Sequence, residues 1–339
     1  MSLNCELDVL ERRFINRYQG GFPLSGKPYH VVAATLGTTE TTLISRIRKL
    51  LDSGVLSRFG PLYDAKRLGG DVVLAALRVP ENDFDRVSQQ VNAYSSVAHN
   101  YRRQHELNMW FVVSAETPEV ISRTLEDIGR QTGLRVYGFP KLREFYLGLW
   151  FQVNGDDSVE TVPIKLSPPS ENPQIDAIDK KIIAATQEGF PLTPAPWDML
   201  AKETGIPAER IPERLARMLR SGVIRRIGAI PNHYRLGLRS NAMTVWDIPD
   251  EHLQELGSRV GQLPFVSHCY ERPRYPEIWP YNLFAMVHGH NRAEVAGMID
   301  RISAELKGHC RSHDALYSTE ILKKTGLRLQ SERETTCLD

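Results

Sequence analysis

The chain contains one pattern twice. Residues 7–70 align without a gap on residues 175–238, and 20 of the 64 aligned positions are identical. The longest shared segments are Gly21-Phe22-Pro23-Leu24 with Gly189-Phe190-Pro191-Leu192, and Ser53-Gly54-Val55 with Ser221-Gly222-Val223. An internal repeat of this length predicts two copies of one fold, because both copies carry the same order of apolar, polar and turn residues. Any structure proposed for one copy must therefore suit the other.

The first 60-odd residues of each copy predict helices. Apolar spacing in copy one predicts helices over Asp8–Tyr18 and Val31–Leu36, and a third helix that begins at Thr38 or Thr39. A short helix, a glycine turn and a further helix form the helix-turn-helix pattern. Alternating residues over Val55–Gly60 then predict the start of a wing strand.

The second half of each copy predicts the order β-α-β-β-α-β, which is ferredoxin-like. In copy one the expected elements are Val72–Val79, Asn82–Asn92, Val97–Arg102, Met109–Ala115, Pro118–Gln131 and Leu142–Phe151. In copy two they are Asn241–Ile248, Glu251–Val260, Val266–Tyr270, Asn282–Val287, Arg292–Leu306 and Ala315–Leu322. We therefore predict an α+β protein, a tandem duplication of a winged helix-turn-helix plus a ferredoxin-like domain.

The domain boundaries follow from this duplication. A polar segment with several prolines, from Gly155 onward, is typical of an exposed linker between the copies. The expected domains are helix-turn-helix 1–70, ferredoxin-like 71–154, linker 155–174, helix-turn-helix 175–238 and ferredoxin-like 239–339.

Composition narrows the class of protein. The 339 residues carry a formal net charge of +1, so charge supplies no argument for nucleic acid or an anionic membrane. No apolar run is long enough to cross a bilayer, and the N-terminus lacks a signal-peptide core. The four cysteines, which form no Cys-x-x-Cys pair, are Cys5, Cys269, Cys310 and Cys337. We expect a soluble cytoplasmic protein without a structural metal site.

A polar motif recurs in the two ferredoxin-like halves. Both copies read His-x-Tyr-x-Arg inside a predicted strand. The residues are His99, Tyr101 and Arg103 in copy one, and His268, Tyr270 and Arg272 in copy two. Successive strand residues alternate sides, so all three side chains of each stripe should project from one face. A proton carrier, a phenol and a fixed cation on one face are suited to holding a carboxylate.

The whole pattern resembles the Lrp/AsnC family of amino-acid-responsive regulators, on the strength of the domain order and the segment Ser221–Ala229. A narrower resemblance lies in the stripes and the polar clusters that follow them. The segments Val97–Arg103 and Asn108–Phe111 resemble one subunit of the siroheme decarboxylases, which share this fold. The segments Val266–Pro273 and Trp279–Phe284 resemble the other subunit. The chain looks like both subunits joined in one polypeptide.

The resemblance implies a reaction. Siroheme decarboxylases remove the acetate carboxyls at ring positions 12 and 18, and the 12,18-didecarboxysiroheme feeds heme d-type or alternative heme synthesis. No cofactor is expected, because the macrocycle accepts the electrons and the iron belongs to the substrate. Arg103 and Arg272 would then hold carboxylates, and His99 and His268 would donate protons. Tyr101 and Tyr270 would be supporting donors.

Further residues near the stripes are candidates for substrate binding. The siroheme carboxylates need cations and its macrocycle needs apolar walls. These candidates are Arg102, His105, Asn108, Trp110, Arg274, Trp279, Tyr281, Asn282 and His288. Packing is an alternative role for Trp110, and His105 is also a possible axial iron ligand. His309 and His313 are four apart, but we expect them on a solvated surface.

The alternative function is a duplicated Lrp/AsnC-type transcription regulator that senses a small ligand or a heme. The third helix of each copy carries basic residues that could contact phosphates: Arg46, Arg48 and Lys49, and Arg210, Arg214, Arg217 and Arg220. Pro212 within that helix and the near-zero net charge count against DNA. The expected partners are thus siroheme and its product, with no membrane and no nucleic acid. An internal pseudo-dimer is expected, and a homo-oligomer is possible.

Overall fold

Each copy of the repeat contributes to two units of the structure. A computed structural model describes residues 7–156, 158–164, 169–172, 174–306 and 308–324. The helix-turn-helix unit is built from described residues within 1–68, 150–160 and 165–238. The ferredoxin-like unit is built from those within 69–149, 161–164 and 239–339. The like halves of the two copies are thus grouped together.

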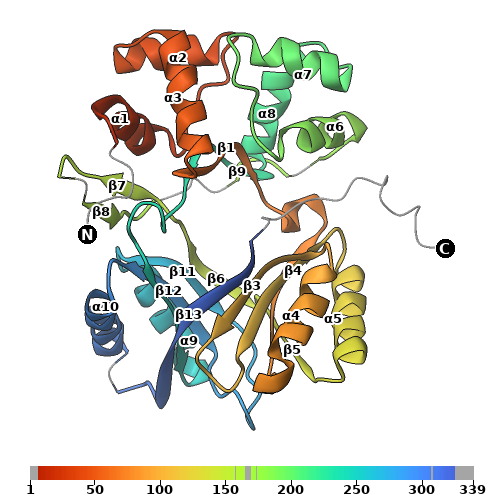
Figure 1. The fold of residues 1–339 in the computed structure, drawn as a ribbon, viewed down its shortest axis with the longest axis vertical. Helices are drawn as coiled ribbons and strands as arrows, with labels where there is room; N and C mark the ends of the chain where they lie inside the picture. The colour runs from red at the N-terminus through yellow and green to blue at the C-terminus, as the bar shows by residue number, and fades with distance from the viewer. Residues whose placement is uncertain (1–6, 157, 165–168, 173, 307, 325–339) are drawn as a thin grey trace. The chain divides into compact units, whose positions relative to one another are not determined.

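The helix-turn-helix unit contains the predicted helices of both copies (Figure 1). Copy one supplies α1 (Val9–Tyr18), α2 (Pro28–Leu36), α3 (Glu40–Asp52) and β1 (Leu56–Tyr63). Copy two supplies α6 (Ala177–Thr186), α7 (Pro196–Thr204), α8 (Arg210–Arg220) and β9 (Ile224–Pro231). Helix α2 begins three residues before its predicted start, because a proline suits the first helical position. Thr39 caps α3, as one of the two predicted caps.

The two wings pair with each other as antiparallel strands. Gly60 of β1 lies opposite Gly228 of β9. The Phe22 amide donates to the Ile227 carbonyl at 3.1 Å, and the matching Phe190 amide donates to the Phe59 carbonyl at 2.9 Å. The two copies therefore repeat the same backbone contact across the wing pair.

One strand of a short pair, β8 (Val159–Thr161), lies within the expected linker 155–174, and its partner β7 (Phe151–Val153) lies just before that linker. The two strands form a short two-stranded sheet. Asn16 lies in α1 and Gln19 directly follows it. The side-chain amides of both residues form hydrogen bonds with the backbone of β7. These side chains hold β7 against α1. The composition of the segment does not predict this contact.

The ferredoxin-like unit contains two copies of the predicted order. Copy one supplies β2 (Asp71–Leu77), α4 (Phe84–Ala93), β3 (Val97–Arg103), β4 (Met109–Ala115), α5 (Pro118–Thr132), β5 (Val136–Pro140) and β6 (Arg143–Leu147). Copy two supplies β10 (Ser240–Asp247), α9 (Asp250–Gly261), β11 (Val266–Glu271), β12 (Leu283–Gly289), α10 (Arg292–Glu305) and β13 (Ser312–Lys324). The predicted final strand of copy one, Leu142–Phe151, was wrong in its bounds: β6 occupies only Arg143–Leu147 of it, and β5, which lies before it, was not predicted.

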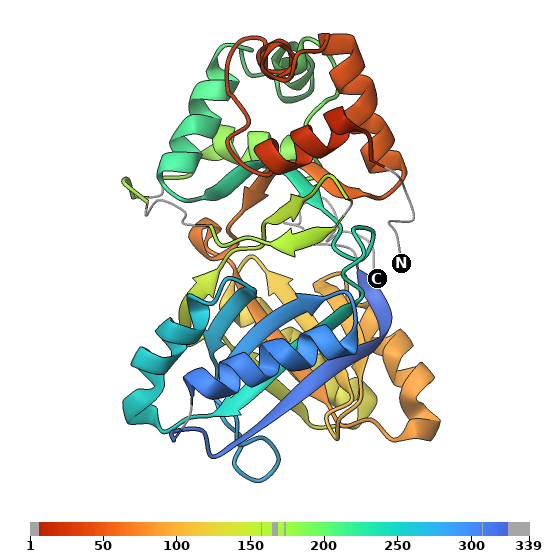
Figure 2. The ribbon, with the colours of Figure 1, turned by 90° about the vertical axis from the view of Figure 1, so that its left-hand side faces the viewer.

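The last strand of each copy pairs with the other copy. The nine-stranded sheet has the order β5-β2-β4-β3-β13-β10-β12-β11-β6. Strand β6 of copy one pairs with β11 of copy two. The first half of β13 pairs with β10 of its own copy, and the second half pairs with β3 of copy one (Figures 1 and 2). Phe145 accordingly packs into the core of copy two, and Leu322 into that of copy one. Within this unit the copies form the expected internal pseudo-dimer.

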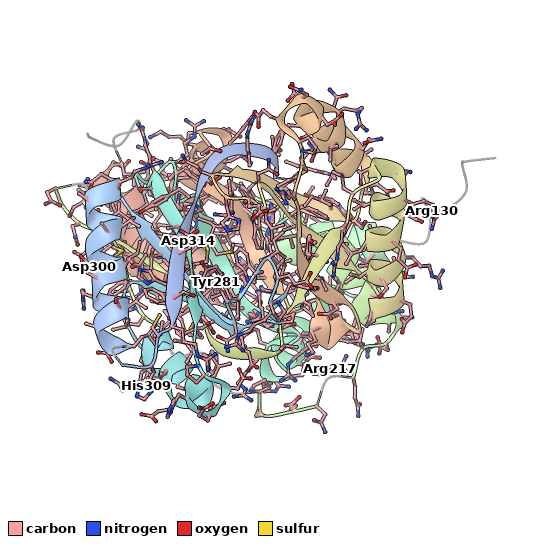
Figure 3. The ribbon with its side chains drawn as sticks, turned by 90° about the horizontal axis from the view of Figure 1, so that it is seen from below. Arg130, Arg217, Tyr281, Asp300, His309 and Asp314 are labelled. Carbon is pink, nitrogen blue, oxygen red and sulfur yellow. The ribbon has the colours of Figure 1, made fainter. Side chains whose placement is uncertain are left out.

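Among the described residues of this unit, helices cover one face of the nine-stranded sheet, which we call the outer face, and we call the opposite face the inner face. Helices α4 and α5 pack on the copy-one strands, and α9 and α10 pack on the copy-two strands. Figure 3 shows Arg130 on α5 and Asp300 on α10 at opposite flanks, with Tyr281 and Asp314 between them. A third core lies on the inner face, where strand side chains of both copies meet loop side chains. It contains Ala76, Leu107, Trp110, Phe139, Met243, Val245, Trp279, Phe284 and Leu316.

Membrane-spanning helices, metal-binding clusters and cysteines are assessed in the described residues alone. No helix there is long and apolar enough to cross a membrane. No group of three or more metal-binding side chains is found among those residues. Cys269 and Cys310 are free thiols, whereas Cys5 and Cys337 lie outside the described residues.

Candidate active site

Both His-Tyr-Arg stripes lie on the inner face of the sheet. Tyr101 is directly opposite Trp110, and Tyr270 is directly opposite Phe284. Residues directly opposite in an antiparallel pair share a face, and both partners belong to the inner core. The intervening Asn100 and Cys269 face the helices instead: Asn100 bonds Asn92 of α4, and Cys269 packs in the outer core. These contacts confirm that each stripe presents one face.

Within each stripe, the tyrosine ring lies near both the histidine and the arginine side chain. The His99 and Tyr101 rings are 6.2 Å apart, and the His268 and Tyr270 rings are 6.0 Å apart. The Arg103 guanidinium lies 5.7 Å from the Tyr101 ring, and the Arg272 guanidinium lies 5.1 Å from the Tyr270 ring. The same order of proton carrier, phenol and cation is therefore built twice.

Each stripe arginine reaches across to a strand of the other copy, Arg103 to β13 and Arg272 to β5. Arg103 donates through Nη1 to the Leu316 carbonyl at 2.5 Å, and Arg272 donates through Nη1 to the Phe139 carbonyl. Burial lowers the pKa of Arg272 to about 10, which still leaves it charged near neutrality. No carboxylate among the described residues lies within ion-pair distance of Arg272, and its buried Nε has no hydrogen-bond partner there. Arg272 therefore retains capacity for a carboxylate ligand.

His268 belongs to a chain of side-chain hydrogen bonds. Its Nδ1 lies 2.8 Å from Ser267 Oγ, which lies 2.8 Å from His288 Nε2. His288 Nδ1 then lies 2.6 Å from Asn241 Oδ1. Burial lowers the pKa of His288 to about 3, so its imidazole is neutral at ordinary pH. Sequence reasoning named His288 but missed Ser267 and Asn241. The difference between Ser267 and its counterpart Ala98 was the available signal.

A second cluster of predicted residues lies between the two hairpins. The rings of His105 and Trp279 are 5.2 Å apart, and Trp279 packs against Trp110 at 4.9 Å and Tyr281 at 5.0 Å. His105 Nε2 is 3.9 Å from the carboxylate of Asp314. Desolvation lowers the pKa of His105, although the nearby carboxylate opposes this shift. Trp110 and Trp279 have no exposed surface, so packing accounts for both indoles.

Two predicted asparagines hold backbone rather than facing the stripes. Asn108 accepts from the Val79 amide at 2.9 Å and donates to the Val79 carbonyl at 2.8 Å. Asn282 makes the same pair of bonds with Ile248, at 3.0 and 2.9 Å. Both amides thus fix the chain where it leaves β2 or β10.

Two predicted arginines are also engaged elsewhere. Arg102 lies over the Phe84 ring on the helix side of the sheet and pairs with Glu81. Arg274 bonds Asp247 at 2.9 Å, Asp250 at 2.5 Å and a loop carbonyl. The structure therefore does not bring these two guanidiniums to the stripes. Lys141, which sequence reasoning missed, lies 5.2 Å from the Tyr270 ring and pairs with Glu144.

Comparison with known families agrees with this architecture. The profile of the AsnC-like ligand binding domain matches residues 67–146 and 235–323. The profile of the siroheme decarboxylase NirDL-like HTH domain matches residues 11–56 and 179–225. Both domain types therefore occur twice, in the order that the duplication predicts.

Individual relatives match the whole chain or about half of it. A siroheme decarboxylase of Hydrogenobacter thermophilus is 34% identical over 322 residues, which cover 93% of each chain. The NirH subunit of the siroheme decarboxylase of Stutzerimonas stutzeri is 49% identical over 48% of this chain and 96% of its own. A crystal structure of the siroheme decarboxylase NirDL with an iron-uroporphyrin III analogue has a TM-score of 0.67 at 29% identity, covering 94% of this chain and 92% of that one. With this sequence likeness along nearly its whole length, the chain belongs to the siroheme decarboxylase family.

Proposed function

We propose that the chain decarboxylates siroheme at the C12 and C18 acetates and releases 12,18-didecarboxysiroheme for heme d-type or alternative heme synthesis. The observation that supports this best is the pair of stripes on the inner face. In each one the imidazole ring lies 6.2 or 6.0 Å from the tyrosine ring, and the guanidinium lies 5.7 or 5.1 Å from that same ring. The NirDL relative with a bound iron-uroporphyrin III analogue supports a tetrapyrrole as the substrate.

The stripe chemistry suits loss of carbon dioxide. The bond between the carboxyl carbon and the ring-attached methylene breaks, carbon dioxide leaves, and the electron pair passes into the macrocycle. One proton added to the methylene carbon then gives a methyl group. His99 and His268 supply that proton, because an imidazole changes charge near neutrality. Tyr101 and Tyr270 lie beside them as supporting donors.

The arginines position the substrate in this proposal. A guanidinium forms paired hydrogen bonds with a carboxylate, and Arg272 offers charge that no described carboxylate neutralises at ion-pair distance. Binding the departing carboxylate tightly would slow its loss, since only interactions that are stronger in the transition state accelerate a reaction. Arg103 and Arg272 therefore hold neighbouring carboxylates of the substrate.

The reaction as proposed needs no separate organic cofactor. The tetrapyrrole itself accepts the electron pair, and its iron arrives as part of the substrate. The protein supplies orientation, cations and protons, which are the contributions that fixed side chains make. His105 and the aromatic residues around Trp279 would border the substrate from the hairpins.

A regulator that binds DNA is less well supported, because four of the seven basic residues named in the third helices pair with buried carboxylates. Lys49 of α3 pairs with the fully buried Glu11 at 2.8 Å, and Arg217 of α8 pairs with the equivalent Asp179. Arg46 and Arg214 repeat this arrangement with the same two carboxylates. These contacts hold each third helix to the first one of its copy.

One sequence argument against DNA was nevertheless wrong. Pro212 was expected to remove a backbone donor from the third helix. Helix α8 begins at Arg210, so the proline occupies its first turn. The first amides of a helix have no partner within it, so Pro212 costs no helical hydrogen bond. The internal ion pairs, and not the proline, support a scaffolding role for these helices.

The proposed function is tested by anaerobic incubation of the full chain with siroheme, followed by mass spectrometry. We expect a product that has lost two carbon dioxide units, with no added organic cofactor. An unchanged siroheme mass, together with a salt-dependent shift of a specific DNA, would favour the regulator instead.

A further inference from the structure

The two stripes differ in what stands behind the histidine. In copy two, Ser267, His288 and Asn241 form a continuous hydrogen-bonded chain to His268 Nδ1. These three side chains are at most 7% exposed, so water competes little for their bonds. We call this chain the copy-two relay.

Copy one lacks the groups that build such a relay. In both copies the histidine follows a bulge in its strand, and Ser267 and Ala98 occupy the same position in it. Asn241 and His288 are paired across β10 and β12, and their counterparts Val72 and Ser114 are paired across β2 and β4. Alanine and valine offer no side-chain hydrogen bond. The matching positions of copy one therefore do not build this particular relay.

The direction of the relay follows from its buried end. The Asn241 Oδ1 only accepts, so His288 must carry its proton on Nδ1. A neutral His288 then has a lone pair on Nε2, which is the nearer of two acceptors for the Ser267 hydroxyl, at 2.8 Å against 3.3 Å for the Met286 carbonyl. The hydroxyl oxygen in turn accepts from His268, whose proton must lie on Nδ1.

We propose that Ser267 and His288 are positioning residues that keep a proton on Nδ1 of His268, so that Nε2 is the atom that transfers a proton. This inference rests on the proposed function. When His268 is charged, Nε2 carries the proton that the substrate methylene receives. After transfer, His268 is left as the neutral Nδ1–H form, which is the form that the relay stabilises. Copy two thereby fixes the tautomer of its stripe histidine through side chains that the matching positions of copy one do not supply.

The tautomer of His268 tests the relay directly. The protein is labelled with ¹⁵N-histidine, and His268 is identified by the loss of its signals in His268→Gln. Long-range ¹H–¹⁵N spectra of the wild type should show neutral His268 with its proton on Nδ1. In Ser267→Ala the proton should move to Nε2, and in Ser114→Ala it should stay on Nδ1. An Nε2–H form in the wild type, or an unchanged spectrum in Ser267→Ala, would overturn the proposal.

Kinetics provide a second, independent readout. Ser267→Ala creates the side chain that copy one already has in the same bulge, so folding should tolerate it. We expect kcat for siroheme to fall about tenfold while KM changes by less than about twofold, because the general acid is misoriented while substrate contacts remain. Ser114→Ala is the matched control and should retain the wild-type kcat.

The outcomes separate the two levels of the proposal. Equal kcat values for Ser267→Ala and Ser114→Ala in an active protein would refute the relay and leave the proposed function standing. A wild-type chain that removes no carbon dioxide from siroheme would contradict the proposed function, and with it the catalytic purpose of the relay.

Discussion

At the scale of single residues, buried polar groups separate structural roles from chemical ones. The sequence predicts both stripes and the face they share, because alternation along a strand is a local property. It does not reveal that Asn108 and Asn282 are bound to backbone, since their partners Val79 and Ile248 lie 29 and 34 residues away. A polar residue near a motif therefore resembles a ligand until its own hydrogen bonds are known.

His288 gives a residue-scale prediction about pH. Its pKa falls from an ordinary 6.5 to about 3 in the folded chain, chiefly through desolvation. The unfolded chain then binds more protons between these values, so stability should fall as pH drops below 6.5. Urea unfolding at a series of pH values should show that the wild type loses up to about 1.4 kcal/mol per pH unit more than His288→Gln. The exposed His30→Gln is the control, and parallel curves for the wild type and His288→Gln would contradict this account.

At the scale of elements, local signals predict most helices and strands, whereas partners are set by the whole fold. Strand β5 was missed because Gly138 and Pro140 are typical of turns. The pairing of β6 and β13 with strands of the other copy was likewise not predicted, since a period of two specifies a face but not a neighbouring strand. The basic residues of α3 and α8 suggested phosphate contacts, yet four of them pair with Glu11 or Asp179 instead.

The wing pair gives an element-scale prediction. A Cβ on Gly228 would overlap the Tyr18 carbonyl oxygen, and backbone there cannot give way easily. Gly228→Ala should therefore destabilise the chain by about 3 kcal/mol, as other overpacked sites do. A methyl group at Gly26 would meet no atom within 4 Å, so Gly26→Ala is the matched control. Denaturant unfolding measures both variants. Equal stability of both variants would show that β9 is not packed this closely against the end of α1.

At the scale of the whole molecule, duplication followed by divergence explains the two unequal sites. Each stripe arginine bonds a strand of the other copy, Arg103 to β13 and Arg272 to β5, so each stripe has a partner from the other copy. The copies then differ around this shared frame. Copy one offers His105 in its hairpin, and copy two offers the relay behind His268. The first difference was predicted from the sequence, and the second was not. Ser267 and Asn241 become partners of the stripe only through the strand bulge and the register of β10 with β12.

The central claim is that the stripe histidines carry out the decarboxylation of siroheme. The most direct measurement is the single-turnover rate of carbon dioxide loss under anaerobic conditions for His99→Ala and His268→Ala. Each variant should bind siroheme and react at least about tenfold more slowly than the wild type, since a general acid contributes a factor of that size or more. The exposed His309→Ala should react at the wild-type rate. Unchanged rates in both stripe variants would contradict the account.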